Sequence, residues 1–79
     1  MEKLVWNQIS AVLRAAFMEA AYSYGLSEGR YSRHLGAKSK EDFHKMLAEM
    51  DLSESGEETL RDMNACGVKH GLELRKGGN

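Results

Sequence analysis

The chain has 79 residues, which is enough for one small domain and excludes two. Hydrophobic residues make up 42% of it and charged residues 29%, a balance that is typical of a globular protein and excludes an intrinsically disordered one. The chain has no proline, and its β-branched residues are few and dispersed, so the composition predicts an all-α fold. Cys66 is the only cysteine, which excludes an intrachain disulfide and favours a reducing, cytoplasmic environment.

The first predicted element is a long helix that begins near Glu2 or Lys3 and ends at Gly25. Its polar positions recur at helical spacing along one narrow stripe, formed by Lys3, Asn7, Ser10 and Arg14. The opposite, apolar face comprises Val5, Ile9, Val12, Leu13, Ala16, Phe17, Ala20 and Tyr24. Because the rest of the chain is short, we expect another polypeptide to cover this face, and we predict a homo-oligomer interface there. The charge of Arg14 near the middle of the helix argues against a membrane span.

Shorter helices are predicted after the first one. We expect residues 27–36 to form a short helix capped by a serine. Residues 39–50 carry apolar side chains at helical spacing behind another serine cap, which predicts the next helix. A further serine cap starts a helix at residue 55, which we expect to continue to about residue 74. Alternating apolar residues over 68–74 are also compatible with a short strand. The sequence therefore predicts a single helical domain over residues 1–74 and a mobile C-terminal tail over 75–79.

The segment from Asp51 to Asp62 resembles the calcium-binding loop of an EF-hand. Such a loop supplies oxygen ligands from its first, third, fifth, seventh, ninth and twelfth positions and has glycine at the sixth. The corresponding ligands here are Asp51, Ser53, Ser55, Glu57, Thr59 and Asp62, with Gly56 at the turn. Asp62 is shorter than the glutamate that normally stands twelfth, and the alternative is a helix cap that contains oxygens. The resemblance implies weak calcium binding, and no other cofactor is predicted.

Basic and aromatic residues gather between the first helix and residue 38. They are Arg30, Tyr31, Arg33, His34 and Lys38, and we predict that they bind a partner. Residues 28–47 also resemble a helix-turn-helix pattern, with Leu35 before the turn and Gly36 in it, which implies nucleic-acid binding. Acidic residues in the second helix of that pattern would repel phosphate, so a protein partner is favoured over a nucleic acid. The acidic stretch from Glu49 to Asp62 is a second candidate for partner docking.

Cys66 and His70 lie four residues apart, so on a continuous helix they share one face. This spacing is compatible with a pair of metal ligands or with activation of the thiol. Two ligands do not complete a zinc site, and the alternative is a buried thiol beside an exposed histidine. The sequence contains neither a phosphate-binding glycine loop nor a clear set of nucleophile, base and orienting residue, so we predict no catalytic residues.

Together these features predict a small non-catalytic protein-interaction or regulatory module of the inhibitor or adaptor type that acts as a homo-oligomer. A phage or mobile-element origin would suit its size. The alternatives are a degenerate single EF-hand-like calcium-binding protein and a small helix-turn-helix-like regulator that binds nucleic acid.

Overall fold

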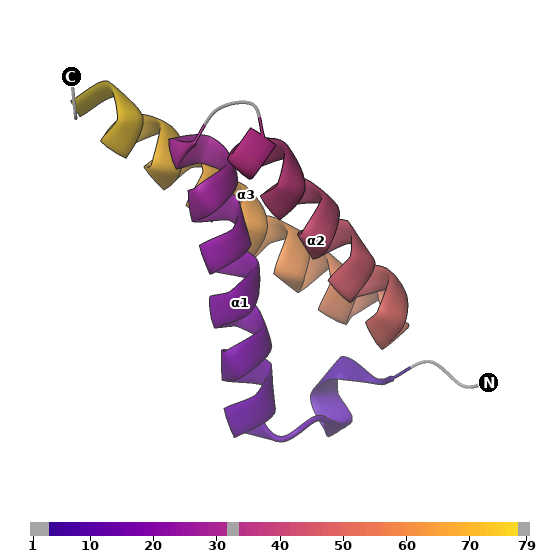
Figure 1. Cartoon of the computed structure of the whole chain (residues 1–79). Helices are drawn as coiled ribbons and strands as arrows, with labels where there is room; N and C mark the ends of the chain where they lie inside the picture. Colours follow the sequence, from indigo (N-terminus) through magenta and orange to yellow (C-terminus); the bar gives the residue numbers. More distant parts are fainter. Residues whose placement is uncertain (1–3, 32–33, 78–79) are drawn as a thin grey trace.

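The computed structural model describes residues 4–31 and 34–77, which form three α-helices preceded by a short 3-10 turn (Figure 1). The turn is η1 (Trp6–Gln8), and the helices are α1 (Ala11–Arg30), α2 (His34–Met50) and α3 (Glu54–Gly77). α2 runs back from the end of α1, and α3 returns in the same general direction as α1 and crosses it obliquely (Figure 1). The molecule is elongated, with extents of 46 × 21 × 17 Å. The predicted all-α class is confirmed, and none of the helices in the described ranges is long and apolar enough to span a bilayer.

The segment that precedes α1 is attached to the connection between α2 and α3. The Leu4 amide donates a hydrogen bond to the Asp51 carbonyl at 3.0 Å, and the Leu4 carbonyl accepts one from the Ser53 amide at 2.7 Å. The Trp6 amide donates to the Ser53 hydroxyl at 3.2 Å. The Trp6 indole is buried against Gly56, where an added Cβ would lie 3.0 Å from Trp6 Cε3. These contacts position the start of the chain beside the start of α3.

The start of α1 therefore differs from the prediction. The helix begins at Ala11 instead of near residue 2 or 3, and residues 1–3 lie outside the described part of the chain. Ser10 caps α1, because its hydroxyl accepts a hydrogen bond from the Leu13 amide at 3.3 Å. Asn7 lies in η1. The predicted polar stripe is consequently wrong, since two of its members stand before the helix.

α1 and α3 approach each other so closely that their backbones are in contact. A Cβ added to Gly25 would lie 2.0 Å from the Asn64 carbonyl oxygen, and one added to Gly67 would lie 2.2 Å from the Tyr22 carbonyl oxygen. Only glycine fits at such distances. The buried glycines at this crossing are Gly25, Gly29, Gly67 and Gly71.

This crossing explains why Gly25 does not end the first helix. A glycine inside a helix costs about 1 kcal/mol relative to alanine, and the packing of α3 against α1 offsets that cost. The Asn64 side-chain amide also donates to the Ala21 carbonyl at 3.0 Å across the crossing. α1 continues to Arg30, so the predicted stop at Gly25 is wrong. Of the separate short helix predicted over residues 27–36, residues 27–30 belong to α1 and residues 34–36 to α2.

The boundaries of the other two helices also shift. Ser39 lies within α2, where its hydroxyl donates to the Ser27 hydroxyl at 2.7 Å, and so it is not the predicted cap. α3 is continuous from Glu54 to Gly77, so the strand considered for residues 68–74 is wrong. Residues 75–77 are helical, whereas 78 and 79 lie outside the described residues. The mobility expected of the tail stays a prediction.

The buried core is small and lies where α1 packs against α2 and α3, with Trp6 of η1 contributing beside α3. The predicted apolar face of residues 39–50 is confirmed, because Phe43 and Leu47 are buried on α2. Leu60 on α3 is completely inaccessible to solvent. The core residues are Trp6, Ala21, Phe43, Leu47, Leu52 and Leu60.

Candidate functional site

The eight residues predicted to form the oligomer interface are divided between the core and the surface. Three of them are half-buried and pack against the core, namely Ile9, Phe17 and Tyr24. Val5, which precedes η1, is 44% exposed. The remaining four lie on α1 and are exposed or half-buried: Val12, Leu13, Ala16 and Ala20. We call these four the exposed α1 face.

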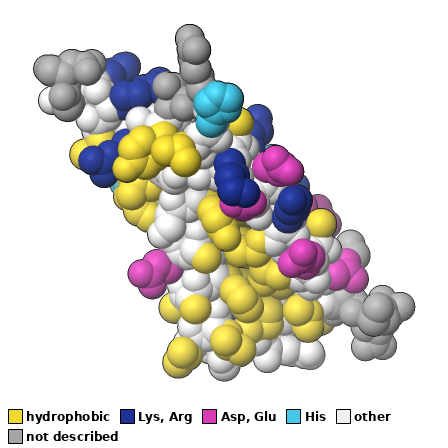
Figure 2. Space-filling view, in the orientation of Figure 1, with side chains coloured by type: hydrophobic (Ala, Val, Ile, Leu, Met, Phe, Trp, Pro, Cys, Tyr) yellow, Lys and Arg dark blue, Asp and Glu magenta, His cyan; other side chains and the backbone are white. Residues whose placement is uncertain are grey.

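The exposed α1 face is apolar and continuous along the helix. Its members are three or four residues apart from Leu13 through Ala16 to Ala20, so they fall on one side of α1. Val12 is 79% exposed and Leu13 is 51% exposed. Figure 2 shows hydrophobic side chains gathered over the lower half of α1 and the space between α1 and α2.

A second apolar surface lies between α1 and α3 and was not predicted from the sequence. It is an open hollow of about 450 Å³ lined by Ala15, Met18, Glu19, Tyr22 and Met63. Met18 and Met63 are partly buried against the core and also line this hollow. The hollow depends on the pairing of α1 with α3, and no local pattern in the sequence indicates that pairing.

The predicted partner-binding residues lie where α1 ends and α2 begins. The Arg30 guanidinium carbon is 5.6 Å from the centre of the Tyr31 ring, a cation–π arrangement. His34 is exposed at the start of α2, and Lys38 lies 3.7 Å from Asp42 in an exposed ion pair. Arg33 lies outside the described residues. We call Arg30, Tyr31, His34 and Lys38 the basic cluster.

The helix-turn-helix interpretation places the turn at the wrong residues. Gly36, which that pattern places in the turn, is inside α2 and buried. A Cβ on Gly36 would lie 2.3 Å from the Tyr31 carbonyl oxygen, so this glycine permits close packing. Leu35, expected before the turn, is also helical and is 59% exposed. α1 ends at Arg30 and α2 begins at His34, so the connection between the two helices falls before the position that this pattern gives it.

The segment that resembles an EF-hand loop does not form a loop. Residues 54–62 belong to α3, and a helix uses its backbone carbonyls for its own hydrogen bonds, so the Glu57 carbonyl is not free for a cation. The Ser53 hydroxyl accepts from the Trp6 amide, and the Thr59 hydroxyl donates to the Ser55 carbonyl at 2.8 Å. Ser55 and Asp62 are helical residues with exposed side chains. The six predicted ligands are therefore not brought together around a common point.

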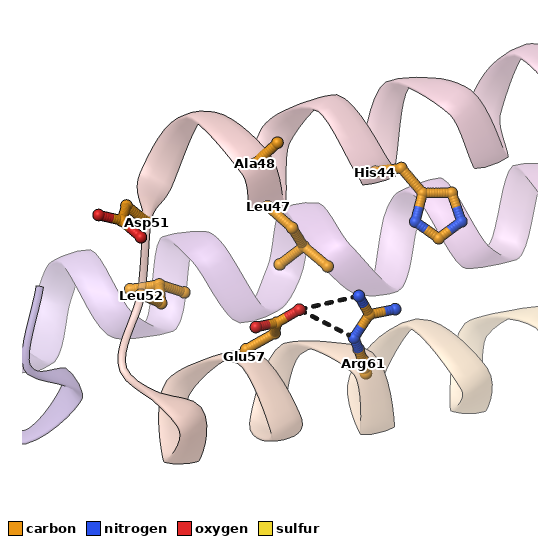
Figure 3. Close-up of a pocket in the computed structure, with 7 residues that line it drawn as sticks. All are labelled: His44, Leu47, Ala48, Asp51, Leu52, Glu57 and Arg61. Atoms are coloured by element: carbon orange, nitrogen blue, oxygen red, sulfur yellow. Dashed lines mark hydrogen bonds and ion pairs between the residues drawn. The ribbon is translucent and has the colours of Figure 1, made fainter. Parts of the chain in front are cut away.

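A polar hollow of about 230 Å³ lies between the end of α2 and the start of α3 (Figure 3). Arg61 donates two hydrogen bonds to Glu57 Oε1, from Nη2 at 2.8 Å and from Nε at 3.2 Å. Because Glu57 neutralises this guanidinium, Arg61 does not present an unbalanced charge to an anion. The hollow is lined by His44, Leu47, Ala48, Asp51, Leu52, Glu57 and Arg61.

Acidic side chains lie at the start of α3, and basic side chains lie at the ends of α1 and α3. Glu54 and Glu57 lie in the first turn of α3, and Arg75 and Lys76 lie in its last turn. Arg30 lies in the last turn of α1. Figure 2 shows Lys and Arg side chains near the end of α3. Acids at the start of a helix and bases at its end also stabilise the helix dipole.

Cys66 and His70 share one face of α3, as their spacing predicts. The Cys66 sulfur is 3.9 Å from His70 Nε2, and both residues are exposed, which contradicts the expectation of a buried thiol. The structure adds a third residue, because the Tyr22 hydroxyl of α1 lies 2.7 Å from His70 Nδ1. We call Tyr22, Cys66 and His70 the polar cluster. Sequence reasoning missed Tyr22 because it stands 48 positions from His70 and reaches it only across the α1–α3 crossing.

The described residues contain no group of three or more metal-ligating histidine, cysteine, aspartate or glutamate side chains, so the polar cluster of one chain holds two such ligands. The proposals below therefore rest on the exposed α1 face and on the polar cluster. The chain matches no family model, no curated protein and no solved structure with which it was compared.

Proposed function

We propose that the protein is a small, non-catalytic interaction module that self-associates through the exposed α1 face and uses its charged ends to bind a protein partner. The observation that carries this proposal is the exposure of two large apolar side chains, Val12 and Leu13, beside a buried core of only a few residues. Contiguous exposed apolar surface of this kind marks protein interaction sites. An inhibitor or adaptor role would suit such a module.

The energetics favour a reversible association. Complete burial of a fully exposed aliphatic side chain contributes roughly 1.5–3 kcal/mol. Val12 is 79% exposed and Leu13 is 51% exposed, so a two-fold interface that buries both residues of both copies gains about 4–8 kcal/mol before the costs of association. Those costs are about 4–15 kcal/mol, so these two residues by themselves would at most balance the loss of freedom. Burial of Ala16, Ala20 and the partly exposed Phe17 would add to the gain. We therefore expect a weak association, with a dissociation constant in the micromolar to millimolar range.

Size-exclusion chromatography with light scattering over a range of protein concentrations tests this proposal. We expect the wild-type mass to rise with concentration toward a multiple of the chain mass, and Leu13→Glu to remain monomeric. Leu35→Glu is the matched control, because Leu35 is 59% exposed at the other end of the molecule and should leave association unchanged. Far-UV circular dichroism would confirm that both variants stay helical. A wild-type chain that is monomeric at its highest soluble concentration would contradict the proposal.

The charged ends support a protein partner, since complementary charge guides docking and its sign selects the partner. We call Glu54 and Glu58, near the start of α3, the acidic end. Reversing the basic cluster with Arg30→Glu and Lys38→Glu should weaken binding to a protein that uses the basic cluster. Reversing the acidic end with Glu54→Lys and Glu58→Lys should weaken binding to a protein that uses the acidic end. A nucleic-acid binder behaves differently, because reversal of the acidic end would strengthen binding to phosphate. Electrophoretic mobility shifts at low salt separate the two cases, and we expect no retardation of nucleic acid by micromolar protein.

A further inference from the structure

The polar cluster has the arrangement of half of a tetrahedral metal site. Structural zinc is bound by four cysteine or histidine ligands at about 2.3 Å for sulfur and about 2.0 Å for nitrogen, which places a sulfur and a nitrogen on one ion roughly 3.5 Å apart. Cys66 Sγ and His70 Nε2 lie 3.9 Å apart and come from consecutive turns of α3. A small side-chain rotation would bring both atoms to one ion. No change of the backbone is needed, because the two residues share a face of a continuous helix.

Tyr22 occupies the position of an orienting group behind the histidine. A histidine that binds a metal commonly donates its other ring N–H to a neighbouring oxygen, which sets the tautomer and the direction of the ring. The Tyr22 hydroxyl is 2.7 Å from His70 Nδ1, and the two rings meet edge to face with centres 5.7 Å apart. When the Tyr22 oxygen accepts a hydrogen bond from Nδ1–H, the proton stays on Nδ1, and Nε2 keeps a free lone pair on the side of the ring where Cys66 lies.

One chain cannot complete the site with the residues that the structure describes. No third histidine, cysteine, aspartate or glutamate joins Cys66 and His70 there, and His44 lines the separate hollow between α2 and α3. The two ligands are nevertheless exposed on the surface and accessible to another molecule. A two-fold axis beside α3 would supply a second Cys66 and a second His70, and the four ligands would then form a Cys₂His₂ set.

We propose that Cys66 and His70 form a zinc half-site, which a second copy of this chain completes, with Tyr22 as a positioning residue. Zinc would thereby join two chains through α3. This inference goes beyond the proposed self-association and uses different residues, so either proposal can fail while the other holds. Binding would release the thiol proton, because the metal-bound form of cysteine is the thiolate.

The test uses the full chain carrying Leu13→Glu, kept reduced with a phosphine, so that neither the exposed α1 face nor a disulfide contributes to association. Zinc is titrated by calorimetry, and the mass is measured by light scattering. We expect one zinc ion for every two chains together with a doubling of the mass. Cobalt in place of zinc should show the intense visible bands of a tetrahedral site and a thiolate-to-cobalt charge-transfer band.

Single substitutions assign the ligands. Cys66→Ser and His70→Ala should each abolish the doubling of mass, and Cys66→Ser should also abolish the charge-transfer band. His44→Ala is the matched control at an exposed histidine on α2 and should bind zinc as the parent chain does. Tyr22→Phe keeps the ring and removes the hydroxyl, and we expect a zinc affinity about 10-fold lower with unchanged stoichiometry. Circular dichroism of each variant checks that the helices persist.

The inference is overturned if zinc does not bind at 100-fold excess, if it binds one ion per chain without a change in mass, or if Cys66→Ser binds as tightly as its parent. The self-association proposal is tested separately, by measuring the mass of the wild-type chain in the presence of a chelator. A monomer under those conditions, with zinc-dependent doubling retained, would contradict the exposed α1 face and support the half-site.

Discussion

Substitution of Gly67 by alanine tests the backbone contact between α1 and α3. An added Cβ would lie 2.2 Å from the Tyr22 carbonyl oxygen and 2.8 Å from the Leu26 amide nitrogen. Ordinary van der Waals contact begins at 3.4 Å, so α1 and α3 would have to separate by roughly 1 Å to accept the methyl group. Both neighbouring atoms belong to a helix backbone, which cannot rotate away as a side chain can.

Two effects of opposite sign decide the stability of Gly67→Ala. Alanine raises helix propensity and would stabilise α3 by about 1 kcal/mol. Overpacking costs about 1–3 kcal/mol, and the upper part of that range applies because the obstacle is backbone. We therefore expect a net loss of about 2 kcal/mol, which corresponds to a fall in melting temperature of roughly 8–16 °C for a domain of this size.

Thermal denaturation at one fixed chain concentration measures this loss, since self-association would otherwise change the apparent stability. Far-UV circular dichroism reports the helices, and fluorescence of the single tryptophan, buried Trp6, reports the attachment of the N-terminal segment. Gly77→Ala on the same helix is the matched control, because its Cβ would meet nothing within 4 Å and should change stability by less than about 0.5 kcal/mol. If Gly67→Ala proves as stable as the wild type or more so, as helix propensity predicts, the close crossing is refuted.

Three further predictions concern the core, the start of α1 and calcium. Leu60→Ala removes a completely buried side chain and should cost about 2–5 kcal/mol in urea denaturation, whereas Leu74→Ala, at a residue that is 52% exposed, should cost far less; equal losses would contradict the assigned core. Ser10→Ala removes the cap of α1 and should lower the free energy of unfolding by about 1 kcal/mol, with exposed Ser23→Ala as the control within the helix. Because residues 54–62 are helical, millimolar calcium should leave the melting curve unchanged, and a rise specific to calcium over magnesium would restore the EF-hand hypothesis.

Local patterns predicted the parts of the fold that depend on neighbouring residues. The absence of proline and the scarcity of β-branched residues predicted helices, and the spacing of Phe43 and Leu47 predicted the buried face of α2. The four-residue spacing of Cys66 and His70 correctly placed them on one face of a helix. Each of these features is determined within one or two helical turns.

The errors occur where a residue's role is decided by atoms far away in the chain. Gly25 has the local features of a helix end, but its surroundings include the Asn64 carbonyl, 39 positions later, which requires the absence of a side chain. Trp6 falls within the range predicted for the first helix, but it lies in η1, where its amide donates to the Ser53 hydroxyl and its ring packs against Gly56. For both residues, the local sequence pattern predicts a position that these distant contacts override.

The sequence by itself determined that this protein is helical and which residues can share a helix face, because helix propensity and side-chain periodicity act over a few neighbouring positions. Only the tertiary structure decided where α1 begins and ends, that it crosses α3, and that Tyr22 meets His70. These outcomes depend on contacts between residues that are distant in sequence, and no local spacing encodes which of the available surfaces will pack together.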